Sequence, residues 1–172
     1  MPKVRFFCAV SMDGFLAAAD GSVAFLDAFE GDYGYNDFIG AVGAVVMGRK
    51  TYEVTRANGQ WPYAGKRAYV LSRSRLNTEY GHAMLVPDGQ TLLTRLELLD
   101  EADGDVWVVG GGEVHSLFLD AGAVDQIDLF VMPVALGDGI PLFAGGATHI
   151  KLQLMDNEVY ADGVVRLTYR PA

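Results

Sequence analysis

Three consecutive glycines at positions 110–112 are the strongest chemical signal in this sequence. They follow the apolar segment Val106–Val109, and an amphipathic segment follows them directly. The apolar residues of that segment recur at helical spacing: Val114, Leu117, Phe118 and Ala121. A helix that starts beyond a glycine turn points its free N–H groups into the turn, where an anion can bind. A tight strand-to-helix turn without a ligand explains this segment, taken alone, equally well.

The two common nucleotide-binding fingerprints are absent from the glycine segment. His115 stands where G-x-G-x-x-G would have its third glycine, and no Lys-Ser or Lys-Thr pair follows as in a P-loop. Glu113 falls in the first turn of the expected helix, where an acid complements the helix dipole. It would repel a phosphate unless its side chain points away, so the rest of the chain must decide.

Two other apolar segments also end in groups suited to anions. Residues 42–47 and 67–71 are followed by Gly48, Arg49, Lys50 and Thr51 in the first case and by Ser72 and Arg73 in the second. Cations at a helix start oppose the helix dipole unless an anion lies between them and the helix. Serine and arginine are usual partners of a phosphate. Each turn alone also fits a solvated loop, but parallel strands bring their carboxyl ends together, so the three ends together predict a nucleotide site.

The identity of the expected nucleotide follows from the charges at these strand ends. No Asp or Glu ends the second or third strand. A site for NAD places an acid against the ribose, whereas arginine accommodates the 2′-phosphate of NADP. Arg49 and Arg73 therefore favour NADPH.

The composition excludes several classes of protein. With 172 residues, of which 51% are hydrophobic, the chain suits one globular domain, residues 1–172. The net charge of −9 argues against nucleic acid and anionic membrane surfaces as partners. No apolar run reaches the length of a membrane span, and the N-terminus lacks the layout of a signal peptide. Cys8 is the single cysteine, so no disulfide can form within the chain, and we expect a cytoplasmic protein. The scattered histidines predict no metal site: His82, His115 and His149.

Strand and helix patterns alternate up to Gly122, and only strand patterns follow. The expected helices span Tyr33–Gly40, Lys50–Thr55, Thr91–Leu99 and Glu113–Ala121. The expected strands span Lys3–Val10, Val42–Met47, Arg67–Leu71, Ala83–Val86, Val106–Val109, Gln126–Leu136, His149–Met155 and Val164–Arg170. Alternation predicts parallel pairing with crossover helices. The last two strands, joined through Asp156–Gly163, predict an antiparallel hairpin. The fold class is therefore α/β, with a mixed, mostly parallel sheet and helices on both faces.

Five stretches, in order along the chain, resemble the dihydrofolate reductase fold. More closely, they resemble its riboflavin-pathway branch, the reductase half of the bacterial bifunctional deaminase-reductase. The stretches are Ala9–Gly14 (AVSMDG), Val46–Glu53 (VMGRKTYE), Leu71–Arg73 (LSR), Val108–Glu113 (VVGGGE) and Pro133–Phe143 (PVALGDGIPLF). The set is especially similar to stand-alone, single-domain members of that branch. The resemblance implies a three-layer fold, NADPH as the cofactor and a homodimer.

The resemblance also implies roles for individual residues. The adenosine phosphates would be held by Gly48, Arg49, Lys50 and Thr51. The 2′-phosphate would contact Ser72 and Arg73, beside Leu71. The pyrophosphate would be wrapped by the backbone N–H groups of Gly110, Gly111, Gly112 and Glu113, between Val109 and Val114. Ala9 and the turn of Asp13 and Gly14 would lie near the nicotinamide ring.

The sequence departs from the family at two places. Riboflavin-pathway reductases resemble one another in a lysine two positions before the alanine of the first strand, where this chain has Phe7. The missing cation weakens the case for a pyrimidine phosphoribosyl substrate. Dihydrofolate reductases carry a Trp-x-Leu-Pro stretch before the acidic helix, and residues 25–32 lack it. Folate reduction is correspondingly disfavoured.

Hydride transfer often needs a proton donor for the atom that gains charge. The acids before and within the first expected helix are Asp27, Glu30, Asp32 and Asp37. By its spacing to Gly48, Asp32 best matches the acid of dihydrofolate reductases, and we take it as the catalytic candidate. Its alternative role is to cap the helix that starts at Tyr33, and that interpretation is the stronger one.

The resemblance therefore implies an NADPH-dependent reductase. The enzyme would transfer a hydride to a small heterocyclic substrate, pyrimidine- or pteridine-like, as 5-amino-6-(5-phosphoribosylamino)uracil reductases do. Two alternatives stay open: dihydrofolate reductase activity, and a non-catalytic nucleotide-binding or regulatory protein on the same fold.

Overall fold

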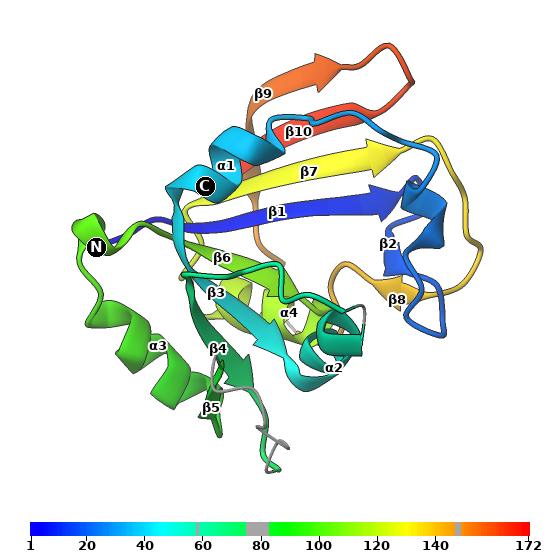
Figure 1. Cartoon of the computed structure of the whole chain (residues 1–172). Helices are drawn as coiled ribbons and strands as arrows, with labels where there is room; N and C mark the ends of the chain where they lie inside the picture. The colour runs from blue at the N-terminus through cyan, green and yellow to red at the C-terminus, as the bar shows by residue number, and fades with distance from the viewer. Residues whose placement is uncertain (58, 75–82, 147–148) are drawn as a thin grey trace.

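The computed structural model describes residues 1–57, 59–74, 83–146 and 149–172, and its main feature is a sheet in the strand order β5-β4-β3-β6-β1-β7-β10-β9 (Figure 1). The strands are β1 (Val4–Ser11), β3 (Val42–Gly48), β4 (Arg67–Leu71), β5 (Ala83–Val86), β6 (Asp105–Gly110), β7 (Gln126–Met132), β9 (Leu152–Val159) and β10 (Val165–Pro171). All pairings from β5 to β7 are parallel, and β10 pairs antiparallel with both β7 and β9. The predicted mixed, mostly parallel sheet with a C-terminal antiparallel hairpin is confirmed.

Helices cover both faces of this sheet, which gives three layers. They are α1 (Tyr35–Ala41), α2 (Arg49–Ala57), α3 (Gly89–Glu97) and α4 (Gly112–Asp120), with short 3-10 turns at Ala24–Leu26 and Glu101–Asp103. Successive residues of β3 show the division. Val46 packs with residues of α3 and α4, whereas Val45 and Met47 pack with Phe38 of α1 and Tyr52 of α2. A strand buried on both sides in this way reads as a continuous apolar run. Within the described ranges, none of these helices has the length and apolar character needed to cross a membrane.

The boundaries at the C-terminal third differ from the sequence prediction. Strand β7 stops at Met132 rather than Leu136 because Pro133 follows, and proline has no N–H for a sheet ladder. Strand β9 runs over 152–159 rather than 149–155, so the hairpin turn is 160–164. Its polar run 156–158 hid the strand, because an exposed edge strand has no buried face to produce alternation.

The start of α1 also differs from the prediction. The helix begins at Tyr35 rather than Tyr33, because Gly34 precedes it with a positive φ of 81°. A residue in that left-handed region cannot continue an α-helix, and glycine occupies it without steric cost.

A small two-stranded ribbon was not predicted. It pairs β2 (Phe15–Ala17) with β8 (Ile140–Pro141) and lies at the end toward which β1 points (Figure 1). Gly139 allows the close approach, because a Cβ there would lie 2.2 Å from the carbonyl oxygen of Ala17. Strands this short carry too little pattern to be read from sequence.

Candidate functional site

The three turns suited to anions meet at one edge of the sheet. Strands β4, β3 and β6 are neighbours, with Leu71 registered against Gly48 and Met47 against Gly110. Parallel strands point the same way, so the segments that follow these residues leave the sheet side by side. We call this region, Gly48–Thr51, Leu71–Ser74 and Val109–Val114, the phosphate edge.

The glycines of the phosphate edge differ in whether the surrounding structure leaves room for a side chain. Gly112 begins α4, and a Cβ there would lie 2.4 Å from the carbonyl oxygen of Pro141, so packing within the protein excludes a side chain. Gly110 has a φ of +134°, and its peptide bond to Gly111 is cis. At Gly48 and Gly111 the nearest atoms to a Cβ would be 3.4 and 3.8 Å away, an ordinary contact. The protein itself does not require glycine at these two positions, which a ligand against the backbone would explain.

Polar side chains connect the turns of the phosphate edge. A Cβ on Gly111 would have the Thr51 hydroxyl oxygen as its neighbour at 3.8 Å, so this hydroxyl faces the glycine turn. The Nε of Arg49 donates to Glu53 at 2.7 Å, and another guanidinium nitrogen donates to the hydroxyl of Ser74, which follows β4. Arg49 therefore spans from the start of α2 to the segment after β4.

The predicted 2′-phosphate residues have distinct surroundings. Ser72 is buried, and its hydroxyl donates to the carbonyl of Ser74 at 2.9 Å, so it shapes the turn. Arg73, the next residue, is exposed, and so is Lys50, which belongs to the turn after β3. Arg75, part of the same polar stretch, lies outside the described residues. The edge therefore carries three exposed cations, Arg49, Lys50 and Arg73, of which Arg49 is paired with Glu53.

The first turn of α4 answers two questions raised by the sequence. Glu113 is exposed, while Val114 and His115, the next two residues of the helix, are buried. His115 has no solvent exposure, and its two ring nitrogens lie 3.2 Å from the carbonyl oxygens of Val108 and Leu142. Burial lowers its pKa, so the ring is neutral. It is a core residue that ties α4 to β6 and to the segment after β8.

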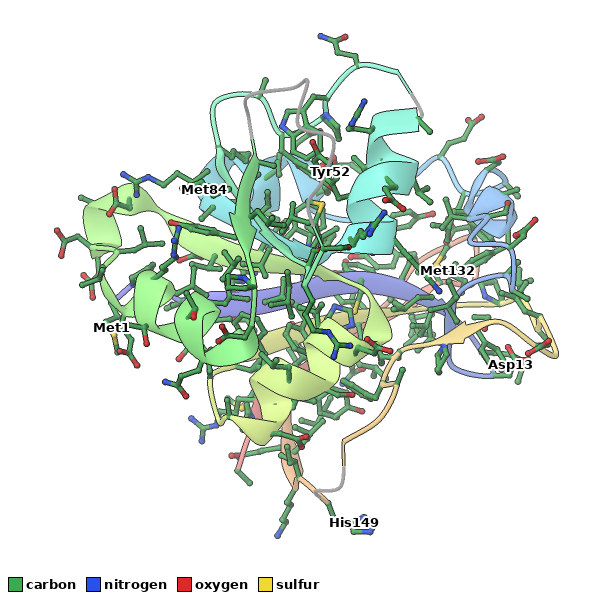
Figure 2. All side chains as sticks on the ribbon, turned by 90° about the horizontal axis from the view of Figure 1, so that it is seen from below. Met1, Asp13, Tyr52, Met84, Met132 and His149 are labelled. Atoms are coloured by element: carbon green, nitrogen blue, oxygen red, sulfur yellow. The ribbon has the colours of Figure 1, made fainter. Side chains whose placement is uncertain are left out.

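The residues predicted near the nicotinamide lie at the end of β1. Figure 2 shows Asp13 and Met1 at opposite ends of the molecule. The Asp13 carboxylate accepts hydrogen bonds from the backbone N–H groups of Leu136 and Gly137 at 3.1 and 2.7 Å. A hydrogen bond from the Ser11 hydroxyl, followed by the Gly137 N–H, lowers the Asp13 pKa to about 2. The Gly14 carbonyl accepts from the N–H of Leu142 at 3.0 Å, so this turn fastens the 136–142 segment to β1.

The catalytic candidate Asp32 lies two residues before Gly34, which is the N-cap of α1. Its two carboxylate oxygens accept from the backbone N–H groups of Gly34 at 3.1 Å and Asn36 at 3.2 Å. Its carbonyl accepts from the N–H of Tyr35 at 2.8 Å. Both side-chain oxygens thus accept hydrogen bonds at the start of α1, but the prediction that Asp32 is the N-cap residue was wrong, because the helix begins two residues later.

A cluster of aromatic side chains joins β1 and β7 to α1, and it was not predicted from the sequence. Phe7 stacks on Phe38 with 4.2 Å between ring centroids and lies 4.6 Å from Phe130. Tyr33 and Tyr160 extend the cluster. We call Phe7, Phe38, Phe130, Tyr33 and Tyr160 the aromatic face. Ala9 packs half-buried against it, so the position predicted to lie near the cofactor ring is bordered by aromatic side chains.

A buried carboxylate lies under the aromatic face. Asp128 has no exposed surface and accepts hydrogen bonds from Arg166 at 2.7 Å, Thr168 at 2.9 Å, Arg5 at 3.0 Å and Gln126 at 2.7 Å. Burial alone would raise the Asp128 pKa, but these donors outweigh it and hold the pKa below its usual value. An acid inside the apolar strand at 127–132 was the sequence signal that could have revealed the cluster.

Metal binding has no support in the described part of the chain, where no three His, Cys, Asp or Glu side chains are arranged to hold an ion. His149 is exposed and projects from the body of the molecule (Figure 2). His82 lies outside the described residues.

The sheet order and the flanking helices define a dihydrofolate reductase-like α/β protein, and comparisons with known proteins agree. The RibD C-terminal domain model matches residues 2–166. The uncharacterized protein YwjB of Bacillus subtilis is 36% identical over 165 residues, which cover 94% of each chain. The chain therefore belongs to the RibD C-terminal domain family.

Solved structures extend the likeness in fold. A putative riboflavin biosynthesis protein from Shewanella sp. PV-4 superposes with a TM-score of 0.84 at 25% identity, covering 100% of this chain and 99% of that one. A diaminohydroxyphosphoribosylaminopyrimidine deaminase/5-amino-6-(5-phosphoribosylamino)uracil reductase from Thermotoga maritima gives 0.73 at 20% identity. That match covers 99% of this chain but 57% of the bifunctional protein.

Proposed function

We propose that this protein is an NADPH-dependent reductase of a small planar heterocycle, related in its chemistry to the pyrimidine reductases of riboflavin biosynthesis. The observation that carries the proposal is the phosphate edge: three turns with glycines, hydroxyls and cations leave three adjacent parallel strands at one place. The likeness to the Thermotoga maritima protein, which is a deaminase and reductase by name, supports the same reaction class.

The residues of the chain would divide the work of binding and orientation. The first N–H groups of α4 lack partners inside the helix and would bind the pyrophosphate. Arg49 and Arg73 would bind the 2′-phosphate through charge-assisted hydrogen bonds. NADPH supplies the hydride when bound. Ala9, small and half-buried, would let a flat ring lie against β1, and the aromatic face would exclude water from it.

A binding titration tests the cofactor assignment. We expect NADPH to bind much more tightly than NADH. Tryptophan fluorescence or calorimetry measures both affinities. Arg73→Gln should weaken NADPH roughly 10- to 100-fold, the equivalent of about 1.5–3 kcal/mol for hydrogen bonds to a charged group, and leave NADH unchanged. Arg170→Gln is the matched control, since Arg170 pairs with Gln153 on the distant hairpin. Equal binding of both cofactors by the unmodified protein would overturn NADPH specificity.

A second candidate function, nucleotide binding without catalysis, is favoured by two observations. Asp32 uses both carboxylate oxygens to accept hydrogen bonds at the start of α1, and Phe7 replaces the cation of related reductases. Turnover separates the two functions. Oxidation of NADPH with any ribosylated pyrimidine or pteridine in a substrate panel supports the reductase, whereas tight NADPH binding with no oxidation across the panel supports the binder.

We further propose a homodimer, as the family resemblance implies, and a cytoplasmic location, as expected from the single cysteine. Strand β9 ends the sheet, and it leaves three large apolar side chains exposed: Leu154, Met155 and Val159. An edge strand of this kind can pair with a second copy. Sedimentation measures the mass directly, and Val159→Lys should shift a dimer toward monomer. A monomer at all concentrations would contradict the proposal.

A further inference from the structure

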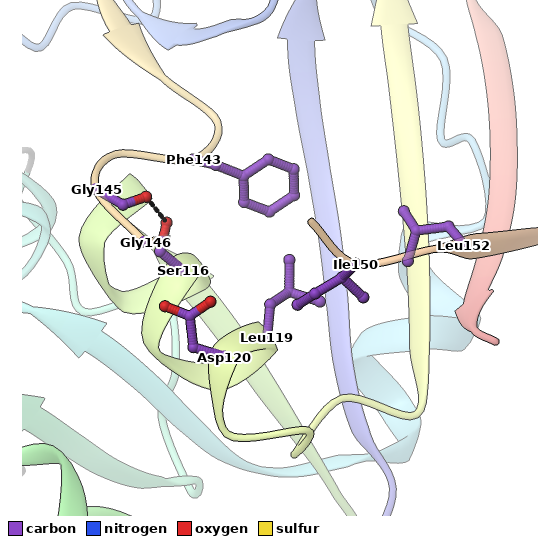
Figure 3. A pocket seen from close by; sticks show the side chains of 8 residues that line it. All are labelled: Ser116, Leu119, Asp120, Phe143, Gly145, Gly146, Ile150 and Leu152. Atoms are coloured by element: carbon purple, nitrogen blue, oxygen red, sulfur yellow. Dashed lines mark hydrogen bonds between the residues drawn. The ribbon is translucent and has the colours of Figure 1, made fainter. Parts of the chain in front are cut away.

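A cavity of about 180 Å³ lies against the second half of α4, away from the phosphate edge. Its walls are Ser116, Leu119 and Asp120 of α4 together with Phe143, Ile150 and Leu152 from the chain that returns to β9. Figure 3 shows these side chains around the hollow, with Asp120 and Ser116 on the same helix. None of these residues belongs to the predicted cofactor or substrate positions.

The size of the cavity separates it from the reductase site. Sites for drug-sized ligands enclose roughly 300–1,000 Å³, so a dinucleotide or a phosphoribosyl pyrimidine cannot fit here. An apolar cavity of roughly 150 Å³ holds a molecule the size of benzene. The occupant is therefore one small ring or a short branched alkyl group.

The side chains that line the cavity are mostly apolar, and two of them, Ser116 and Asp120, are polar. Leu119, Phe143, Ile150 and Leu152 supply the hydrophobic surface, and Phe143 keeps 40% of its surface exposed. The hydroxyl of Ser116 donates to the carbonyl of Gly145 at 3.1 Å, so it is already engaged (Figure 3).

The remaining polar group of the lining is the carboxylate of Asp120. Asp120 is the last residue of α4, where the helix dipole disfavours an anion. The last turn of α4 carries no basic residue, and the described part of the chain offers Asp120 no ion pair. Its oxygens face Gly146, where a Cβ would lie 3.1 Å from Oδ2. Asp120 is exposed, so its carboxylate at the rim of the cavity is open to a cationic group, and the adjacent Phe143 ring can also attract one.

We propose that this cavity binds a small organic cation, a primary ammonium on an apolar ring or branched alkyl body. The body fills the space between Leu119, Ile150 and Leu152, and the ammonium group pairs with Asp120. This site does not depend on the proposed reductase function.

Three probes of one shape test the proposal: benzylammonium, benzyl alcohol and benzoate. Binding is followed by NMR shifts of backbone amides at unchanged pH and salt. We expect benzylammonium to bind at least five times more tightly than benzyl alcohol, benzoate not to bind, and the shifts to centre on Ser116, Asp120 and Phe143. Asp120→Asn should lower the affinity for benzylammonium to that for benzyl alcohol. Leu152→Trp should fill the cavity and abolish binding of both probes.

A matched control removes the effect of the overall negative charge. Glu97 is an exposed acid at the last position of α3, as Asp120 is at the last position of α4, but it does not line the cavity. Glu97→Gln should leave benzylammonium binding unchanged. Each of four results would overturn the proposal. They are equal weakening by Glu97→Gln and Asp120→Asn, equal binding of the three probes, NMR shifts centred elsewhere, and no binding of benzylammonium. The alternative occupant of the cavity is a second copy of the chain, and sedimentation of the Leu152→Trp variant tests it. A change in mass relative to the unmodified protein would show that a second copy fills the cavity.

Discussion

The phosphate edge and the aromatic face use their polar groups in opposite ways. At the phosphate edge Arg49, Lys50 and Arg73 are exposed at the ends of strands. Under the aromatic face Asp128 is fully buried and satisfied by four side chains. The first region leaves its cations exposed, where we propose that a ligand binds, whereas the polar groups of the second region join strands.

This difference predicts which substitutions change the stability of the fold and which change ligand binding. Changes to exposed cations at the phosphate edge should alter ligand affinity and leave unfolding almost unchanged. Changes to the saturated cluster under the aromatic face should alter unfolding first, because a lost partner leaves other charges buried and unpaired.

The largest effect is expected from Asp128→Ala. The substitution leaves the guanidinium groups of Arg5 and Arg166, with 16% and 26% of their side-chain surface exposed, without their shared partner. Removing one partner from a buried ion pair costs about 3–5 kcal/mol, and urea unfolding monitored by fluorescence measures it. Asp156→Ala, on the exposed strand β9, is the control and should have little effect. A loss as small as that of the control would mean that the cluster does not join the strands.

Two glycine variants sharpen the distinction within the phosphate edge. Gly112→Ala places a Cβ 2.4 Å from the Pro141 carbonyl oxygen and should destabilise the fold by about 1–3 kcal/mol, the usual cost of overpacking. Gly48→Ala places its Cβ 3.4 Å from Val114 and should fold normally. It should nevertheless weaken NADPH binding, because the methyl group occupies space at the turn. Thermal unfolding and cofactor titration on the same samples check both results, and unweakened NADPH binding by Gly48→Ala would argue against a ligand at this turn.

The phosphate edge could be predicted from sequence because each of its parts is contiguous. Gly110–Gly112 and Gly48–Thr51 lie in single short segments, and parallel pairing was enough to bring them together. The aromatic face could not be predicted, because Phe7 and Phe130 meet only through the β1–β7 register. Gly112 shows a finer limit: its clash partner, Pro141, comes from a ribbon whose strands are too short to leave a pattern.

The acid dependence of stability is a smaller effect that also comes from Asp128. Its carboxyl has a lower pKa in the folded protein than in the unfolded chain, because the hydrogen bonds outweigh burial. Such a group stabilises the fold fully above its unfolded pKa, about 3.9, and this contribution is lost as the pH falls through the folded pKa. Stability should therefore drop below about pH 4. Asp128→Asn should flatten that part of the profile relative to Asp156→Asn, and parallel profiles would contradict the assignment to Asp128.

The smallest effect on stability, and the sharpest on mechanism, is expected from Asp32. Asp32→Asn keeps one of the two side-chain oxygens that accept at the start of α1, whereas Asp32→Ala removes both and should cost about 1 kcal/mol. If accepting these hydrogen bonds is its whole role, NADPH oxidation by Asp32→Asn should match the unmodified protein, and Asp32→Ala should lose activity only in proportion to its folded fraction. If Asp32 also donates a proton to the substrate, Asp32→Asn should fold normally yet lose turnover, with NADPH affinity unchanged. The second outcome would show that Asp32, at the start of α1, also reaches the substrate. That substrate is the ring that we propose to bind between the phosphate edge and the aromatic face.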